Sequence, residues 1–153
     1  MNDKDVIALV GFELGAERFG AALGKIQEII RHSAIVKIPR APDFLEGIIN
    51  LRGRVIPVID LGKRFNMRGA EKGAKSRIIV AEIRGVRAGL SVDSVSKVLR
   101  APAGSFEKTP ALVSGIDRKF IAGVVKDKEG MLLVLDLDEI FTPEETDLLR
   151  QVD

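Results

Sequence analysis

The side chains that could support catalysis are few and scattered. The chain of 153 residues contains no cysteine and one histidine, His32. Thiol nucleophiles, zinc-thiolate sites and any site that needs two imidazoles are therefore excluded. Ser91, Ser94 and Ser96 have no histidine near them in sequence, and no Gly-rich phosphate loop is present. We expect His32 to have a surface or capping role, and we predict a protein that is not an enzyme and uses no cofactor or metal.

Two aspartates, Asp60 and Asp136, follow similar apolar runs. Each precedes a short apolar segment with a helical pattern, at 61–65 and at 137–141. Aspartate is a favoured residue at the N-cap of a helix, so we interpret both as helix caps. A catalytic pair would require them to be close together, and no sequence pattern indicates that they are.

The strongest candidate for function is a basic turn. Residues 44–65 read FLEGIINLRGRVIPVIDLGKRF, and two apolar runs flank the turn. Gly53 can adopt a positive φ at little cost, which favours a tight hairpin. An exposed arginine in such a turn indicates binding, because an arginine buried at the centre of an interface is often a hot spot. The turn consists of Asn50, Leu51, Arg52, Gly53 and Arg54.

The charge balance gives little reason to expect a nucleic-acid partner. The chain has 24 basic and 22 acidic residues, and the basic excess is concentrated between Lys63 and Arg77. Tryptophan and tyrosine are absent, so the aromatic platforms of single-strand binders are missing. We interpret the basic stretch as a solvated linker. The alternative is a small basic barrel that binds RNA or DNA through Arg52, Arg54 and this stretch, with the salt dependence of phosphate contacts.

The start of the chain is polar, and no apolar run approaches the ~18 residues of a membrane span. We therefore expect a soluble cytoplasmic protein that is a monomer in isolation and does not insert into a membrane.

An internal repeat organises the chain. A shift of 76 positions aligns residues 44–65 with residues 120–141 without gaps, and a shift of 69 aligns residues 23–31 with residues 92–100. The first shift matches Phe44 with Phe120 and Gly47 with Gly123, and the second matches Gly20 with Gly89. The chain is therefore two copies of a unit of about 70 residues, joined near residues 66–76.

Hydrophobic patterns predict mainly β structure. In the first copy, strands are expected at 6–14, 18–22, 36–38, 47–51 and 54–59. The spacing of Leu23, Ile26, Ile29 and Ile30 predicts a helical turn or short helix lying on the barrel, with Ile29 and Ile30 in the core. The sequence TPEE at 142–145 has a capping box with proline at the first helical position, which predicts a helix over 143–151.

The runs VIPVI (55–59) and MLLVL (131–135) are apolar at every position, so both of their faces must be covered. We predict that one face lines its own small barrel and the other packs against the second barrel. The expected fold is mainly β, with two five-stranded barrels on a shared hydrophobic core, short helices and a C-terminal helix. The first barrel is expected over about 16–66 and the second over about 77–141. Strand 6–14 and helix 143–151 are assigned to neither.

These segments make the chain similar to the CheW-like family of chemotaxis coupling proteins. The segments KIQEII (25–30), FLEGIINLRGRVIPVIDL (44–61) and AGLSVDSVSKVL (88–99) occur in the family's order and spacing. The resemblance covers residues 6–149. It implies one CheW-like domain over 1–153, formed by two SH3-like five-stranded barrels, and a non-enzymatic adaptor function in chemotaxis signal transduction.

The resemblance also implies partners and a site. The expected partners are the regulatory domain of the histidine kinase CheA and the cytoplasmic hairpin tips of chemoreceptors, within a receptor array. A non-flagellar chemosensory pathway is the alternative setting. The expected receptor-binding residues include the signature Arg52 and its acidic partner Glu28, and are Ile26, Glu28, Gly47, Arg52, Gly89 and Val98. The residues expected to bind the kinase or to support the hairpin are Asn50, Leu51, Gly53, Arg54 and Val55.

Overall fold

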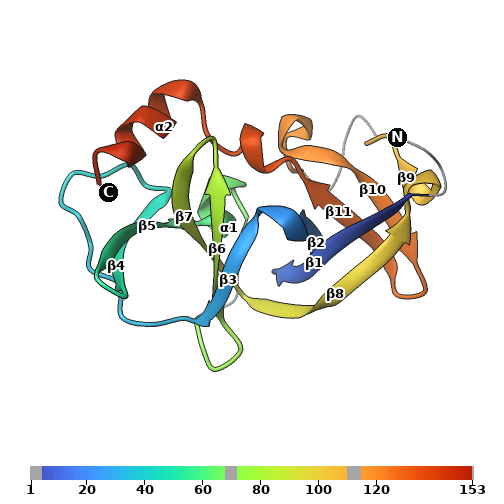
Figure 1. Ribbon diagram of the computed structural model, residues 1–153, viewed down its shortest axis with the longest axis horizontal. Helices are drawn as coiled ribbons and strands as arrows, with labels where there is room; N and C mark the ends of the chain where they lie inside the picture. Colours follow the sequence, from blue (N-terminus) through green and yellow to red (C-terminus); the bar gives the residue numbers. More distant parts are fainter. Residues whose placement is uncertain (1–4, 68–71, 110–114, 153) are drawn as a thin grey trace.

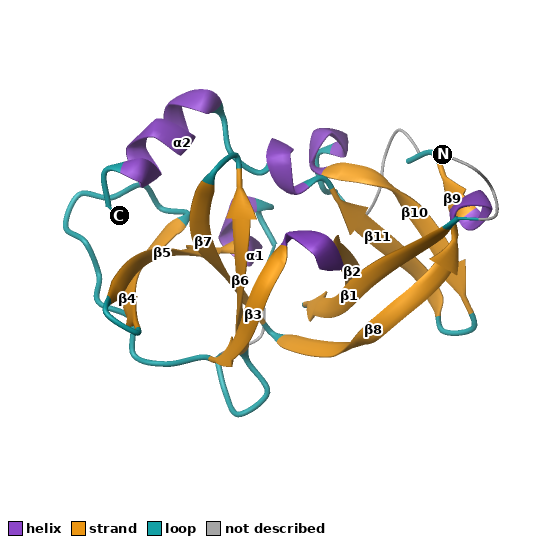
Figure 2. Ribbon diagram, viewed as in Figure 1, coloured by secondary structure: helices purple, strands orange, loops and turns teal. Residues whose placement is uncertain are grey.

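The computed structural model describes residues 5–67, 72–109 and 115–152, and it contains two curled β-sheets that lie side by side (Figures 1 and 2). The five-stranded sheet has the order β3-β6-β7-β5-β4, and the six-stranded sheet has the order β8-β1-β2-β11-β10-β9. The strands of the five-stranded sheet are β3 (Ile26–Arg31), β4 (Leu45–Leu51), β5 (Arg54–Asp60), β6 (Arg77–Ile83) and β7 (Val86–Val92). Those of the six-stranded sheet are β1 (Val6–Leu14), β2 (Glu17–Ala22), β8 (Ser94–Pro102), β9 (Phe106–Glu107), β10 (Ile121–Asp127) and β11 (Gly130–Leu135).

Short helices connect these strands, and a longer helix follows them. The 3-10 turns are η1 (Leu23–Lys25), η2 (Ala103–Ser105), η3 (Arg118–Phe120) and η4 (Leu137–Glu139), and the α-helices are α1 (Leu61–Arg64) and α2 (Pro143–Arg150). Helix α2 begins with the predicted capping box between Thr142 and Glu145. The mainly β fold with two barrel-like sheets and a C-terminal helix is therefore confirmed. The second sheet gains a sixth strand, the two-residue β9.

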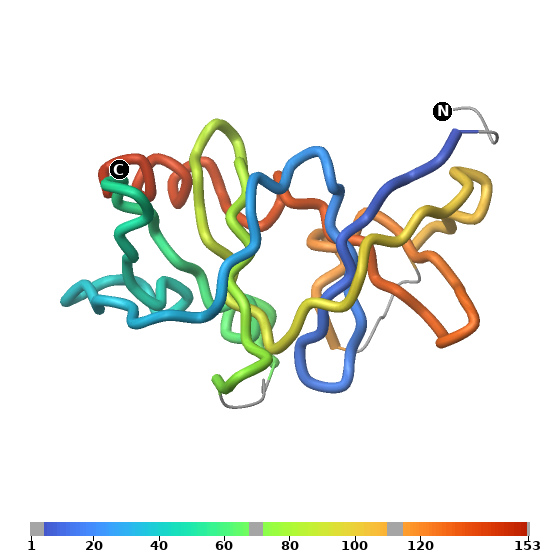
Figure 3. The backbone as a smooth tube through the Cα atoms, turned by 60° about the horizontal axis from the view of Figure 1, so that its bottom comes forward, coloured from blue at the N-terminus to red at the C-terminus, as the bar shows by residue number. Residues whose placement is uncertain are grey.

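The boundaries predicted for the two barrels are wrong, because the two copies of the repeat exchange their first hairpins. Strands β1 and β2 of the first copy pair with β8 and β11 of the second, whereas β6 and β7 of the second copy pair with β3 and β5 of the first. The first barrel therefore spans residues 26–92, and the second consists of residues 6–22 and 94–135. Figure 3 shows the N-terminal segment lying against β8. Sequence similarity could not reveal this exchange, because the hairpins of both copies have the same pattern.

The repeat itself is visible in the hydrogen-bond registers. In β4 and β5 the register shifts at Gly47, and in β10 and β11 it shifts at the matching Gly123. Each hairpin then pairs in parallel with a strand of the other copy, β5 with β7 and β11 with β2. The two hairpins thus have the same place in their barrels.

Three hydrophobic clusters fill the molecule. One lies in the first barrel around Ile56 and Val58, and one lies in the second around Leu132 and Val134. The third and largest cluster lies between the barrels and draws residues from both sheets. Along β5, Val58 faces the first-barrel cluster and Ile59 the shared one. This alternation confirms that strands apolar on both faces are covered on both. The first residue of each run is an exception, because Met131 has 39% of its surface exposed and Val55 is partly exposed.

Aromatic rings join the copies across the shared core. Phe44 lies 5.9 Å from Phe141, and Phe65 lies 5.1 Å from Phe120, measured between ring centroids. The shift of 76 relates Phe44 to Phe120 and Phe65 to Phe141, so the two contacts are equivalents that cross between the copies. Offset and tilted ring pairs of this kind stabilise beyond the area they bury.

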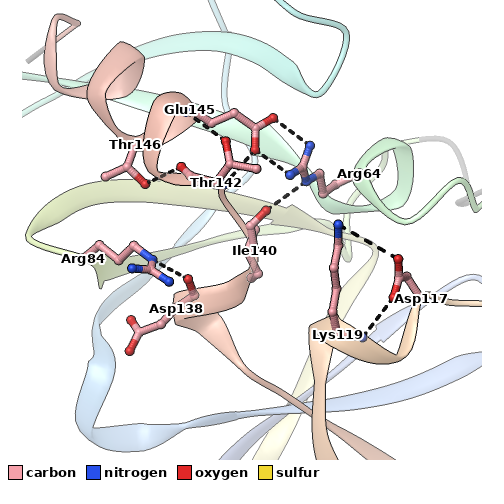
Figure 4. A network of polar contacts seen from close by, with 9 residues as sticks. All are labelled: Arg64, Arg84, Asp117, Lys119, Asp138, Ile140, Thr142, Glu145 and Thr146. Carbon is pink, nitrogen blue, oxygen red and sulfur yellow. Dashed lines mark hydrogen bonds and ion pairs between the residues drawn. The ribbon is translucent and has the colours of Figure 1, made fainter. Parts of the chain in front are cut away.

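Arg64 ties the first barrel to the C-terminal helix (Figure 4). Its Nε donates a hydrogen bond to the Ile140 carbonyl at 2.9 Å, and its two terminal nitrogens donate to the Glu145 carboxylate at 2.9 and 2.6 Å. Its guanidinium also lies 4.9 Å from the ring centroid of Phe44 and 5.6 Å from that of Phe120. Burial raises the pKa of Glu145, but hydrogen bonds from Thr142 and Arg64 outweigh this and leave it below its ordinary value. The interpretation of Arg64 as part of a solvated linker is wrong.

Of the two alternatives predicted from the spacing over residues 23–30, the helical turn is confirmed and the short helix is wrong. Leu23–Lys25 form η1, and the next residues form strand β3, paired with β6. β-branched isoleucines favour a strand where a partner strand is available. Ile30 packs on the first-barrel cluster, but Ile29 has 40% of its surface exposed and is not in the core. The predicted strand 36–38 is reduced to a single bridge between Val36 and Ile48.

The predicted helix caps have different outcomes. The Asp60 side chain accepts a hydrogen bond from the Lys63 amide and caps α1, as predicted. Asp136 precedes η4, but its side chain accepts no capping hydrogen bond.

The hydrogen bonds of Arg64 to Glu145 and Ile140, which act as a clamp between α1 and the C-terminal segment, predict that variants of neighbouring basic residues of α1 differ in stability. Arg64→Ala should lower the free energy of unfolding by about 2–3 kcal/mol, because it removes charged hydrogen bonds that are largely shielded from water. Lys63→Ala, at an exposed position of the same helix, should change it by less than about 0.5 kcal/mol. Urea unfolding followed by circular dichroism measures both. Equal stability of the two variants would contradict the clamp.

Candidate functional site

The basic turn of the sequence is the tip of the β4–β5 hairpin. Leu51 pairs with Arg54, so Arg52 and Gly53 form a two-residue connection. Both residues have positive φ, 51° and 83°, as a type I′ hairpin turn requires. The Gly53 amide donates a hydrogen bond to Oδ1 of Asn50 at 2.9 Å, which fixes the turn. A positive φ is uncommon for arginine, so the hairpin holds Arg52 in a constrained position.

The Arg52 side chain extends to β3 and forms a bidentate ion pair with Glu28. Its terminal nitrogens donate to the two carboxylate oxygens of Glu28, each at 2.7 Å. These hydrogen bonds lower the pKa of Glu28 and raise the pKa of Arg52, and Arg87 on β7 adds a smaller attraction for the carboxylate. The Arg52 side chain remains 75% exposed, against 25% for Glu28. The pair therefore fixes the guanidinium while leaving most of it available to a partner.

The second barrel lacks this bridge. The positions matching Glu28 and Arg52 are Lys97 and Lys128, and two lysines cannot form an ion pair. Its hairpin is held instead by Arg18, which donates to both carboxylate oxygens of Asp127 at 2.9 and 2.8 Å. Hydrogen bonds from Arg18 lower the pKa of Asp127 to about 2. The Arg52 bridge is thus a property of the first barrel and not of the repeat.

Apolar side chains lie exposed on β3 and β8, the edge strands of the two sheets. Ile29 is 40% exposed and Val98 is 47% exposed, and the shift of 69 makes them equivalent. Ile26 is partly buried and packs on the shared core. Both strands face the viewer in Figure 1. Val98 and Ile26 therefore have surface that a partner could cover. Ile29, which sequence reasoning assigned to the core, has such surface as well.

The two predicted site glycines lie inside the fold. Gly47 and Gly89 are buried. A Cβ on Gly47 would collide with the carbonyl oxygen of Val36, and a Cβ on Gly89 would lie 2.7 Å from Cγ2 of Ile78. Each glycine allows two chain segments to approach closely. A substitution there acts through packing, even if it also weakens binding.

The residues assigned to the kinase contact or the hairpin differ in exposure. Asn50 and Gly53 hold the turn, as described above, and Leu51 packs on the first-barrel cluster. Arg54 is exposed, and Val55 is partly exposed opposite Asn50. The geometry supports a hairpin role for Asn50, Leu51 and Gly53, whereas binding of a kinase by this group stays a prediction.

His32, the single histidine of the chain, has a carboxylate as its neighbour. His32 lies beside Glu46, with Nε2 3.5 Å from Oε1 and both side chains about one-fifth exposed. Within the described ranges, no group of three or more histidine, cysteine or acidic side chains could hold a metal ion. No helix in the same ranges is long and apolar enough to span a membrane.

A hairpin that presents a bridged arginine, carried on two barrels with a shared core, defines an interaction domain. Residues 8–145 match the family model described as the CheW-like domain. The chain belongs to this family.

Individual relatives agree with this assignment. The chain is 32% identical over 156 residues to chemotaxis protein CheW of Treponema pallidum, with 99% of this chain and 91% of that one covered. It is 36% identical over 132 residues to chemotaxis protein CheW of Thermotoga maritima, covering 86% and 85%. The crystal structure of the scaffolding protein TtCheW from Thermoanaerobacter tengcongensis superposes with a TM-score of 0.84 at 40% identity, covering 90% of this chain and 89% of that one.

The buried position of Gly47 predicts a folding defect. Gly47→Ala should lower the free energy of unfolding by about 1–3 kcal/mol, because the added methyl group must displace backbone of the preceding loop. Gly24→Ala is the matched control, since a Cβ there meets no atom within 4 Å. Thermal melting compares the two. A Gly47→Ala variant as stable as the control would place Gly47 outside the packed interior.

Proposed function

We propose that the chain is a non-enzymatic adaptor that couples the signalling tips of chemoreceptors to the histidine kinase CheA. Family membership and the similarity to proteins named chemotaxis protein CheW support this role. The observation that links this role to particular residues is the exposed guanidinium of Arg52, which is held by its ion pair with Glu28. The adaptor works on the cytoplasmic side of membrane-anchored receptors, as part of their array.

The receptor contact uses the edge strands near the Arg52 bridge. A receptor tip is helical, and an amphipathic helix binds by placing its apolar side chains against an apolar strip. Val98 and Ile26 offer such surface, and Ile29 extends it. Arg52 and Glu28 supply a charged group beside this strip, already fixed in geometry, so little side-chain entropy is lost when a partner covers it.

The kinase contact uses the residues of the β4–β5 hairpin on either side of Arg52, which are Asn50, Leu51, Gly53, Arg54 and Val55. The turn is rigid because Arg52 and Gly53 occupy a defined hairpin conformation and Asn50 holds the Gly53 amide. A non-flagellar pathway with another receptor and kinase would use the same surfaces, so the experiments below apply to it with those partners exchanged.

Replacement of Arg52 tests the role of the bridge. In a reconstitution of CheA with a chemoreceptor cytoplasmic fragment, Arg52→Ala should require about thirtyfold more adaptor for half-maximal kinase activation, as for a hot spot of ~2 kcal/mol. Its melting temperature should stay within a few degrees of the wild type, because exposed ion pairs contribute little to folding. Lys128→Ala, at the matching position of the second barrel, is the control.

Unchanged activation by Arg52→Ala would exclude Arg52 from the site. A fall of ten degrees or more in its melting temperature would make Arg52 a structural residue instead.

Replacement of Val98 tests the apolar strip separately. Val98→Arg should weaken binding to the receptor fragment by about tenfold or more, because it places a charge where apolar contact is expected. Val36→Arg is the matched control, since Val36 is 65% exposed on a loop outside the edge strands. Co-sedimentation with receptor-containing vesicles measures binding. Equal binding of the two variants would remove Val98 from the receptor contact.

A further inference from the structure

The second barrel has an open pocket at one end, with a volume of about 520 Å³. Its walls are mostly apolar and include Leu9 of β1, Phe106 of β9 and Val134 of β11. Leu9 and Val134 also belong to the second-barrel cluster, and the partly buried Ile7 and Phe106 pack against that cluster and line the pocket. Pockets that bind small molecules have volumes of about 300–1,000 Å³ and are mainly apolar, with a few polar groups that orient the ligand.

One residue that lines this pocket differs between the two copies of the repeat. Ala122 lines the pocket, and its equivalent in the first barrel is Glu46. There the Glu46 carboxylate lies beside His32, with both side chains about four-fifths covered. The small alanine side chain leaves space where the first barrel has a filled, polar contact.

Three charged residues line the pocket, and one carboxylate among them is unmatched. Lys25 donates to both oxygens of Asp138, each at 2.9 Å, so these two charges offset each other. The third is Asp136. Within the described residues, its carboxylate has no hydrogen bond or ion pair. Its repeat equivalent Asp60 differs, because that side chain caps α1. The pocket thus has a net charge of minus one, carried by a carboxylate with open acceptor sites.

We propose that this pocket binds a small amphipathic molecule with an apolar body and one protonated amine. The apolar body covers the exposed part of the second-barrel cluster, and the ammonium group donates hydrogen bonds to Asp136. Charge-assisted hydrogen bonds of this kind are among the stronger polar contacts in proteins. The site lies on the second barrel and does not involve the Arg52 hairpin. The proposal therefore concerns a small-molecule ligand, in addition to the protein partners of the proposed adaptor.

The experiment is a titration of the ¹⁵N-labelled full-length chain with three probes of one shape, 4-phenylbutylamine, 4-phenylbutan-1-ol and 4-phenylbutyrate. The amine should shift the amide signals of Ala122, Leu135 and Asp136 and bind more tightly than the alcohol, with the acid weakest. Asp136→Asn keeps the size of the side chain and removes its charge. It should weaken amine binding by about tenfold, as for one charge-assisted hydrogen bond, and leave the alcohol unchanged.

Two controls separate binding from folding. Asp60→Asn makes the same change at the matching position of the first barrel and should leave all three affinities unaltered. Ala122→Phe fills the pocket from an exposed position and should abolish the amine-induced shifts while the thermal melting of the protein is retained.

Several results would overturn the proposal. One is the absence of shifts at ~10 mM amine, a concentration above the millimolar dissociation constant of a weak ligand. Others are equal binding of the amine and the acid, and an Asp136→Asn variant that binds the amine as the wild type does. Shifts that persist in Ala122→Phe would also overturn it. Preference for the acid would make Lys25 the receiving group and would equally refute the assignment.

Discussion

The buried interface between the barrels is the constraint on which the other features depend. Each barrel receives its first hairpin from one copy of the repeat and its remaining strands from the other. The largest hydrophobic cluster lies between them, and the equivalent pairs Phe44–Phe141 and Phe65–Phe120 cross it. Separation of the barrels would expose this cluster to water, and separation of the two copies would break strand pairing in both barrels. The surfaces of the two barrels are therefore held in a fixed relative position, which the proposed adaptor role with two partners requires.

The features proposed for recognition are found where the two copies differ. The first barrel has the Arg52–Glu28 bridge at its hairpin, whereas the second has lysines at both equivalent positions and a hairpin held by Arg18 and Asp127. The first barrel has Glu46 beside His32 where the second has Ala122 and an open pocket. Backbone features that build the fold, such as the register shifts at Gly47 and Gly123, are the same in both. The comparison of the two copies thus separates residues that shape the barrel from residues for which a recognition role is proposed.

Much of this could be predicted from the sequence, because local patterns carry it. The doubly apolar strands indicated a shared core, the Gly53 turn indicated a hairpin, and the Thr142 capping box indicated the last helix. Contacts between distant segments could not be predicted. The exchange of hairpins leaves no local pattern. The sequence around Arg64 indicates a solvated basic residue, because its partners Glu145 and Ile140 lie far away in the sequence and approach it only in the folded chain. Ile29 was wrongly assigned to the core because the neighbouring sequence does not distinguish a helix with a buried face from an edge strand with an exposed one.

The most direct test of this account is urea unfolding followed by NMR at amides of both barrels, for example Ile49 in the first-barrel cluster and Val125 in the second. If each barrel depends on a hairpin from the other copy and on the shared core, both signals should disappear at the same urea concentration, as in a single cooperative transition. Two separate transitions, with one barrel intact while the other is unfolded, would contradict the shared core as the basis of the fold.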